Sequence, residues 1–220
     1  MESLLNKISF WNELNEDEKK LVSSAAVIKS YEAGEMIHCC TKNCVGMVYV
    51  LSGNMRLFML SSEGKEVTLL HICKNESCVL AASCIMKQIT FYSELVAAEK
   101  TELLIIPASV FSGLMKRNIY VRCYMYENSA KLFSDIMKVM QQTLFCSVEK
   151  RLASFLISEH EKTDSMELKV TQETIAVEIN SAREVVARVL KRFTADGVIK
   201  SKRGKIIILD IDALYDIDSA

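Results

Sequence analysis

Three charged residues, Arg183, Glu184 and Arg188, lie within one short stretch whose pattern predicts a helix. The apolar residues of that stretch can face a core, which leaves these charged side chains on the other faces. An arginine can donate two hydrogen bonds to the O6 and N7 atoms of guanine, and a glutamate can accept one from the N4 amino group of cytosine. The three side chains therefore have the chemistry needed to read base pairs in the major groove of DNA.

Basic residues gather around the same stretch, between Ala182 and Lys205. This segment holds eight basic and two acidic residues, a net charge of +6, although the whole chain carries only −1. A basic face on a near-neutral chain is typical of a DNA-binding surface, because it attracts the phosphates. A solvated helix and hairpin would carry the same charges, so the cluster alone leaves both interpretations open.

The preceding residues predict a first helix and a tight turn. Thr171 is a good N-cap for a short helix with one apolar face. Asn180 falls where the turn needs a left-handed backbone, which asparagine tolerates better than most residues. Ser181 and Glu184 have the spacing of a capping box, so we expect the second helix to start at Ser181.

The residues after the second helix predict a basic wing. Gly197 suits the end of the helix, and the segments VIKSK and KIIIL predict two strands joined at Arg203-Gly204. Two helices, a short turn and a hairpin form a unit that can place its second helix in a major groove. The residues expected to contact phosphates, which set the register without specifying bases, are Lys191, Lys202, Arg203 and, through first-turn amides, Thr171 and Ser181.

Residues 109–146 are predicted to be helical and carry an apolar repeat. The repeat, spaced alternately by four and three residues, consists of Ile119, Cys123, Tyr126, Ala130, Phe133, Met137, Met140 and Leu144. A period of about 3.5 residues is typical of a helix that pairs with a second copy. A helix buried inside a monomer is the alternative, but the regular repeat favours a homodimer.

Short segments rich in β-branched and aromatic residues dominate the chain before residue 108. AVIKSYE, MVYVLS, MRLFML, EVTLLHI, ELVAA and ELLIIP each predict a strand, and they follow a helical start in which Asn15 and Glu18 have capping spacing. Strands at this spacing indicate an antiparallel sandwich or jelly-roll barrel. We therefore expect an α+β protein with a β jelly-roll barrel at 1–108, a dimerisation helix at 109–146 and a winged helix-turn-helix at 147–220.

Several classes of protein are disfavoured by composition and motifs. No apolar run approaches the roughly 20 residues of a membrane span, and the N-terminal residues lack the pattern of a secretory signal. We therefore expect a cytoplasmic protein that does not bind membranes. The chain has no G-x-S-x-G, phosphate-loop, H-E-x-x-H or Rossmann glycine motif, so we do not expect an enzyme.

The segment from Thr171 to Asp210 resembles the winged helix-turn-helix of the superfamily that contains the cyclic-AMP receptor protein and the fumarate-nitrate regulator (Crp/Fnr). The residues that match the family pattern are Thr171, Ile175, Ala176, Ile179, Arg183, Glu184, Val186, Arg188, Leu190, Gly197, Ile199, Gly204, Ile206 and Ile208. Asn180 replaces the turn glycine, and Ala182 replaces a serine whose hydroxyl contacts phosphate. The resemblance extends over the whole chain and includes an R-L-A-x-F-L helix at Arg151.

The resemblance implies a dimeric, sequence-specific DNA-binding transcription regulator, with RNA polymerase as a further partner. Arg183, Glu184 and Arg188 match the base-reading set of the cyclic-AMP receptor protein, whereas the fumarate-nitrate regulator has a valine in place of Arg183. The implied site is an inverted repeat of GTGA-like half-sites, with centres about 10 base pairs apart or a multiple of that. A ligand-sensing or interaction module that no longer reads DNA is the alternative, which the three intact residues disfavour.

The barrel of such regulators, similar to a cyclic-nucleotide-binding domain, holds the effector. In cyclic-nucleotide binders a Gly-Glu turn and a downstream Arg-Ser pair grip the ribose and phosphate. The corresponding region of this chain, KNESCVLAASCIMKQITFYSELVAA, has neither the Gly-Glu pair nor the arginine, and Tyr92-Ser93 stands near the Arg-Ser position. A cyclic phosphate would lack a bidentate partner, so we expect an effector other than cyclic AMP.

Cysteines in the same region offer another sensor chemistry. Cys73, Cys78 and Cys84 lie close in sequence, with His71 nearby. Some members of the superfamily sense through an iron–sulfur cluster or a haem, whose ligands are thiolates and imidazoles. Structural thiols are the favoured interpretation, because free cysteine is among the most buried residue types, and redox or metal sensing is the alternative.

Overall fold

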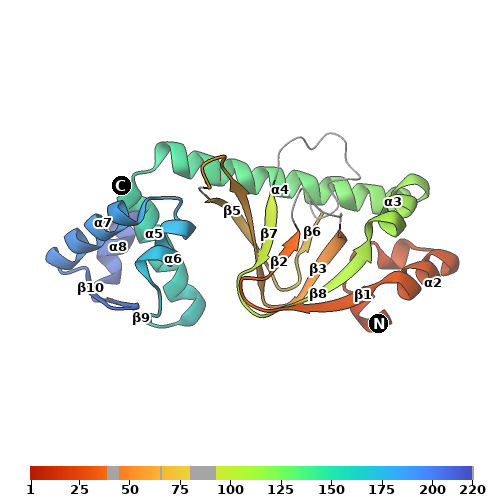
Figure 1. The fold of residues 1–220 in the computed structure, drawn as a ribbon, viewed down its shortest axis with the longest axis horizontal. Helices are drawn as coiled ribbons and strands as arrows, with labels where there is room; N and C mark the ends of the chain where they lie inside the picture. Colours follow the sequence, from red (N-terminus) through yellow and green to blue (C-terminus); the bar gives the residue numbers. More distant parts are fainter. Residues whose placement is uncertain (39–44, 65, 80–92, 220) are drawn as a thin grey trace. The chain divides into compact units, whose positions relative to one another are not determined.

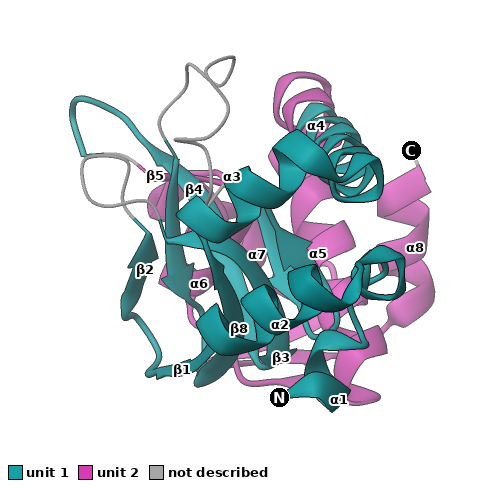
Figure 2. Ribbon diagram, turned by 90° about the vertical axis from the view of Figure 1, so that its right-hand side faces the viewer, with its two compact units in different colours: residues 1–65, 69–137 teal, residues 66–68, 138–220 magenta. Residues whose placement is uncertain are grey.

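A computed structural model describes residues 1–38, 45–64, 66–79 and 93–219. It divides into two compact units, the first comprising residues 1–65 and 69–137 and the second residues 66–68 and 138–220 (Figure 2). The first is a β domain with flanking helices, and the second contains the helix-turn-helix (Figure 1). This mixed architecture confirms the predicted α+β class with an N-terminal β domain and a C-terminal winged helix-turn-helix.

The first unit contains two four-stranded sheets. One has the order β1 (Val27–Tyr31), β8 (Thr101–Pro107), β3 (Gly46–Ser52) and β6 (Ser77–Cys78). The other has the order β2 (Met36–His38), β7 (Glu94–Ala97), β4 (Asn54–Leu60) and β5 (Glu66–Cys73). β3 pairs antiparallel with β8 from Gly46 opposite Pro107 to Ser52 opposite Glu102. The six predicted strands are confirmed, whereas the short strands β2 and β6 were not predicted because each has at most three residues.

Helices cover the outer face of the first sheet. They are α1 (Glu2–Leu5), the short helix η1 (Trp11–Glu13), α2 (Glu16–Ala25), α3 (Ala108–Arg117) and the start of α4 (Ile119–Phe145). Met47, Tyr49 and Leu51 belong to the hydrophobic core between this face and the helices. Since side chains alternate along a strand, Val48 and Val50 face the opposite side, between the two sheets.

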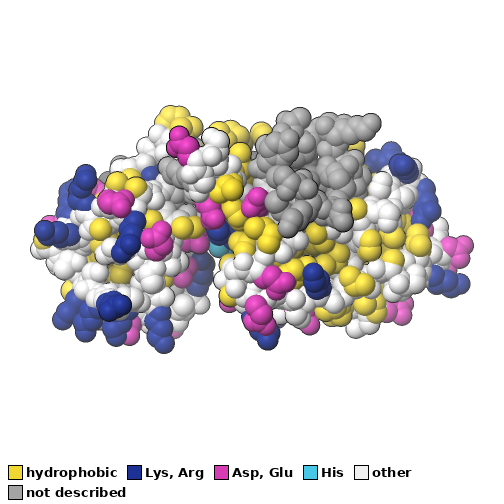
Figure 3. Space-filling view, viewed as in Figure 1, with side chains coloured by type: hydrophobic (Ala, Val, Ile, Leu, Met, Phe, Trp, Pro, Cys, Tyr) yellow, Lys and Arg dark blue, Asp and Glu magenta, His cyan; other side chains and the backbone are white. Residues whose placement is uncertain are grey.

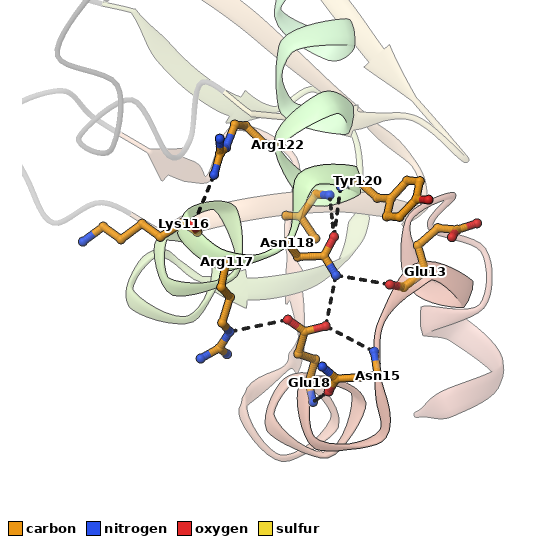
Figure 4. A network of polar contacts seen from close by, with 9 residues as sticks. Glu13, Asn15, Glu18, Lys116, Arg117, Asn118, Tyr120 and Arg122 are labelled. Carbon is orange, nitrogen blue, oxygen red and sulfur yellow. Dashed lines mark hydrogen bonds and ion pairs between the residues drawn. The ribbon is translucent and has the colours of Figure 1, made fainter.

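The predicted helical stretch 109–146 consists of two helices that meet at Asn118. Asn118 Oδ1 accepts hydrogen bonds from the backbone N–H groups of Tyr120 and Val121, and therefore caps α4. Its Nδ2 donates to the buried Glu18 carboxylate at 3.0 Å, which also forms an ion pair with Arg117 (Figure 4). This network fastens the start of α4 to α2 in the first unit.

Glu18 also confirms the predicted capping at the start of α2. Asn15 Oδ1 accepts from the backbone N–H of Glu18 at 2.9 Å, and Glu18 Oε2 accepts from the backbone N–H of Asn15 at 3.1 Å (Figure 4). Such a reciprocal pair satisfies donors at the helix start that have no partner within the helix. One carboxylate thus caps α2 and joins it to the α3–α4 junction.

The long helix α4 has one face in the hydrophobic core between the first sheet and the helices, and one exposed apolar face. Val121 and Met125 are fully buried in the core of the first unit. The members of the predicted repeat are exposed, and Phe133 and Leu144 keep 66% and 69% of their accessible surface. An apolar stripe along a helix of 27 residues is thus left without a partner within the described part of this chain.

Among the described residues, no helix is both long and apolar enough to cross a membrane.

The second unit is a small helical domain with a three-stranded sheet. Its elements are α5 (Val148–Thr163), β9 (Glu167–Leu168), α6 (Gln172–Glu178), α7 (Arg183–Ala195), β10 (Ile199–Lys202), β11 (Lys205–Ile208) and α8 (Ile211–Ser219). The sheet order is β10, β11, β9, with both pairs antiparallel. Leu152, Leu156 and Leu190 lie in its core, which is separate from the core of the first unit. The strand β9 and the helix α8 were not predicted.

Candidate DNA-binding surface

The turn between α6 and α7 is built from local backbone hydrogen bonds. Thr171 caps α6, since its Oγ1 accepts from the backbone N–H of Thr174 at 3.1 Å. At the other end Asn180 has φ = 52°, the left-handed conformation expected from the sequence. The N–H of Asn180 reaches the carbonyl of Val177, and that of Ser181 reaches the carbonyl of Ala176 at 2.9 Å. These two bonds have the pattern of a Schellman motif, which ends a helix at a left-handed residue.

The predicted capping box at Ser181 and Glu184 is wrong. The helix α7 begins at Arg183, its N-cap is Ala182, and no side chain caps it. Ser181 is instead the last residue of the motif that closes α6, because its backbone N–H is committed to Ala176. The sequence spacing of a capping box could not distinguish a residue that ends one helix from a residue that starts the next.

The recognition helix α7 is sharply amphipathic. Its buried residues, Val186, Val189, Leu190 and Phe193, belong to the core of the second unit. Arg183, Glu184, Arg188 and Lys191 are exposed. The predicted base-reading residues thus lie on one rigid element whose opposite face is fixed by packing. Lys and Arg side chains gather over the second unit in Figure 3, where they are dark blue.

A groove is lined by residues that precede the recognition helix in the sequence, by residues of the helix itself and by residues that follow it. Four of the predicted contact residues, Thr171, Arg183, Lys202 and Arg203, line a cavity of about 650 Å³ between the start of α6, the start of α7 and the β10–β11 hairpin. Lys191 lines an adjoining hollow together with Ala187. The remaining predicted residues, Ser181, Glu184 and Arg188, do not line the groove.

The basic residues of this surface differ in whether they have a partner within the chain. Lys205 is held by Glu167 at 2.7 Å, and Arg192 is paired with Glu149. The hydrogen bond from Lys205 holds the pKa of Glu167 below its ordinary value. Arg188, Lys191, Lys200, Lys202 and Arg203, by contrast, have no ion-pair partner among the described residues. Their charges are therefore available to an external anion.

Glu173, in the first turn of α6, is a member of this surface that the sequence analysis did not single out. Its Oε2 lies 3.7 Å from Nε of Arg183, with both side chains largely exposed. Exposed pairs of this kind contribute little to stability. Glu173 therefore places a negative charge beside a predicted base-reading arginine without fixing it. The sequence signal was weak, because an acidic residue in the first turn of a helix is common.

The three cysteines predicted as candidate sensors are in unlike environments. Cys78 is buried in β6, whereas Cys73 is exposed at the end of β5, and Cys84 lies outside the described residues. Within the described ranges, no group of three or more histidine, cysteine, aspartate or glutamate side chains is arranged to hold a metal ion. Redox or metal sensing by Cys73, Cys78 and Cys84 stays a prediction.

Comparison with known proteins places both units. Residues 28–118 match the model of the cyclic nucleotide-binding domain, and residues 150–217 match that of the Crp-like helix-turn-helix domain. A solved structure from Eubacterium rectale, assigned to the Crp/Fnr family of transcriptional regulators, is 40% identical, with a TM-score of 0.94 over 98% of this chain and 100% of that one. The chain belongs to the Crp/Fnr family. It is a DNA-binding transcription regulator with a domain of the cyclic nucleotide-binding type.

Two other proteins are more distantly similar to this chain. The transcriptional regulator SdrP of Thermus thermophilus is 25% identical over 174 residues, which are 76% of this chain and 81% of SdrP. The c-di-GMP-responsive regulator CLP of Xanthomonas campestris is 16% identical, with a TM-score of 0.71 over 88% of this chain and 99% of that one. At this identity the second likeness shows the fold alone.

Proposed function

We propose that this Crp/Fnr regulator reads an inverted repeat as a homodimer, with Arg183, Glu184 and Arg188 contacting the bases. The observation that carries the proposal is the exposure of these three residues on α7, whose opposite face is buried. Two arginines and a glutamate suit G·C pairs, so each half-site contains a GTGA-like core. The amphipathic helix sets their orientation, because rotation about its axis would expose Val186 and Leu190.

Phosphate contacts come from the residues that flank the recognition helix. Lys202 and Arg203 in the hairpin and Lys191 on α7 have no ion-pair partner among the described residues. The backbone amides near Thr171 and Ser181 add neutral donors, with the Ser181 N–H already bonded to Ala176 and contributing least. Such contacts supply affinity and set the register of α7 on the duplex.

The dimer forms through the exposed apolar stripe of α4. Phe133, Met137, Met140 and Leu144 lie on one face of a long helix and are exposed in the single chain. Two such stripes can pair as a coiled coil and bury that surface. A symmetric dimer carries two copies of α7 and matches a DNA site with two-fold symmetry. RNA polymerase is a further partner of a regulator bound at such a site.

The effector is proposed to be a molecule other than cyclic AMP. The region expected to hold the cyclic nucleotide, KNESCVLAASCIMKQITFYSELVAA, contains neither a Gly-Glu pair nor an arginine, which supports this; residues 80–92 of it lie outside the described residues. The regulator CLP, which has the same fold, is described as responsive to c-di-GMP, so the fold is compatible with a signal other than cyclic AMP. Thiol chemistry at Cys73, Cys78 and Cys84 remains an alternative.

Selection of binding sites from a pool of random DNA duplexes tests the proposal. The expected result is a palindromic motif with G·C pairs in each half-site, spaced by about one helical turn or a multiple. The Arg188→Ala variant should select a motif that has lost preference at one base pair per half-site. A selected motif without two-fold symmetry, or failure to enrich any sequence, contradicts the proposal and favours a module that no longer reads DNA.

A further inference from the structure

A cavity of about 340 Å³ lies in the first unit, where the β5–β6 turn meets residues 7–9 and the middle of α4. Tyr49 contributes to its lining from β3, on the face that also carries Met47 and Leu51. This is the outer face of the β1–β8–β3–β6 sheet, beneath the N-terminal helices. The cavity therefore lies outside the space between the two sheets.

One wall of the cavity is a fixed chain of hydrogen bonds between α4 and β6. Tyr124 Oη donates to Ser77 Oγ at 2.6 Å, and Ser77 Oγ donates to Asn128 Oδ1 at 2.9 Å. Asn128 Nδ2 donates in turn to the backbone carbonyl of Tyr124 at 2.8 Å. Burial raises the pKa of Tyr124 despite the hydrogen bond to Ser77, so the phenol stays protonated as a donor at neutral pH. These side chains are held in place before any ligand arrives.

A second wall is the ion pair between Glu76 and Lys131, at 2.8 Å. Burial acts to raise the pKa of Glu76, but the hydrogen bonds from Lys131 and from the backbone N–H of Cys73 bring it below its ordinary value. Glu76 is thus charged at neutral pH and satisfied by its own partners. This ion pair forms part of the cavity wall, and its hydrogen bonds leave few donors or acceptors for a ligand.

Two other charged residues at the cavity have no partner within the described part of the chain. Lys7 and Glu127 line it from the N-terminal segment and from α4, and both are exposed. Neither side chain has a hydrogen-bond or ion-pair partner among the residues that the structure describes. The cavity thus offers one free ammonium group, one free carboxylate and a wall of oriented polar groups with tyrosine rings beside them.

We propose that this cavity binds a small zwitterion of the α-amino-acid class. Lys7 takes the ligand carboxylate and Glu127 takes its ammonium group, while the rings of Tyr49 and Tyr124 line the space for its side chain. A volume of about 340 Å³ is at the small end of ligand pockets, which suits a single amino acid. A bound ligand would bridge the N-terminal segment and α4.

The full-length protein is screened without DNA, by thermal unfolding, against each proteinogenic L-amino acid at millimolar concentration. A ligand that binds only the folded state raises the melting temperature, and calorimetry then gives the Kd. Putrescine and succinate serve as probes that carry only the ammonium or only the carboxylate chemistry. At least one amino acid should stabilise the protein and bind more tightly than either probe.

Variants locate the binding. Glu127→Gln and Lys7→Met should each weaken binding by about tenfold or more, because each removes a charged hydrogen-bond partner. Glu102→Gln, an equal charge change on β8 outside the cavity, should leave the Kd unchanged. The proposal is overturned if no amino acid stabilises the protein, if a probe binds as tightly as the best amino acid, or if Glu127→Gln binds it as wild type does. None of these outcomes affects the DNA-binding proposal, because no measurement involves DNA.

Discussion

The two units of this regulator differ in how far apart in the sequence the residues of their proposed sites lie. In the second unit the contact residues lie within a short segment of chain, on α6, α7 and the hairpin. In the first unit the cavity that we assign to a ligand draws on residues from Lys7 to Asp135. A site whose residues lie close together in the sequence can be predicted from local sequence patterns. A site whose residues lie far apart in the sequence forms only when the chain folds, so local patterns do not predict it.

The largest expected effect is on the element that joins the two functions, the paired helix. Phe133→Glu places a charge in the proposed helix pair, where neither copy can neutralise it. The variant should sediment as a monomer at concentrations where the wild type is a dimer, and should lose specific DNA binding.

A matched change on the same helix is Gln142→Glu, which adds a charge outside the apolar repeat. This variant should remain a dimer with unaltered DNA affinity. If Phe133→Glu still forms a dimer as readily as the wild type, α4 is not the dimer interface. Another element would then have to hold the two copies together.

The next effect concerns base reading in the second unit. Arg188→Ala removes a bidentate donor and should cost about 1–3 kcal/mol of binding to the selected site while relaxing one base pair in each half-site. Competition binding against duplexes changed at single positions measures both. Arg192→Ala is the control, because Arg192 lies on the same helix but is paired with Glu149 and Asp196. An unchanged motif for Arg188→Ala would mean that the recognition face is misassigned.

A smaller effect is expected in the wing. Lys202→Ala removes one phosphate contact, so it should weaken binding to every sequence about equally and reduce the slope of log K against log salt by about one. Titrations at several salt concentrations give the slope. Lys20→Ala on α2 makes the same charge change outside the proposed surface and should alter neither quantity. A sequence-dependent loss in Lys202→Ala would instead assign Lys202 to base reading.

No effect is expected from cyclic AMP on the first unit. Millimolar cyclic AMP should change neither the melting temperature nor the DNA affinity, because the region expected to hold the cyclic phosphate has no arginine. Calorimetry gives an independent measurement. Tight binding of cyclic AMP in calorimetry would contradict this prediction and would show that other groups of the β domain bind the phosphate.

Features governed by local backbone preferences were predictable. The six longer strands of the first unit followed from their content of β-branched and aromatic residues, and Asn180 and Gly197 were placed at turns that require positive φ. Arg183, Glu184 and Arg188 were predicted to be exposed because the apolar spacing of their helix leaves only one face for them. In these cases the residues that decide the structure lie within a few positions of the structure they decide.

Features governed by contacts between distant residues were not predictable. The break at Asn118 depends on Glu13 and Glu18, about a hundred residues earlier in the chain. The start of α7 depends on the hydrogen bond from the backbone N–H of Ser181 to the carbonyl of Ala176, which the pattern of side chains does not predict. The cavity in the first unit was missed for the same reason, since Lys7 and Glu127 have no relation in the sequence.

The exposed stripe of α4 has a consequence for how the regulator responds to its own abundance. If folding and DNA binding both need the paired form, mass action makes the melting temperature rise with protein concentration. Below the dissociation constant of the pair, the amount of dimer grows with the square of the total protein. A doubling of copy number would then raise the competent species about fourfold. The apolar face of a single helix would thus make site occupancy a steep function of gene expression.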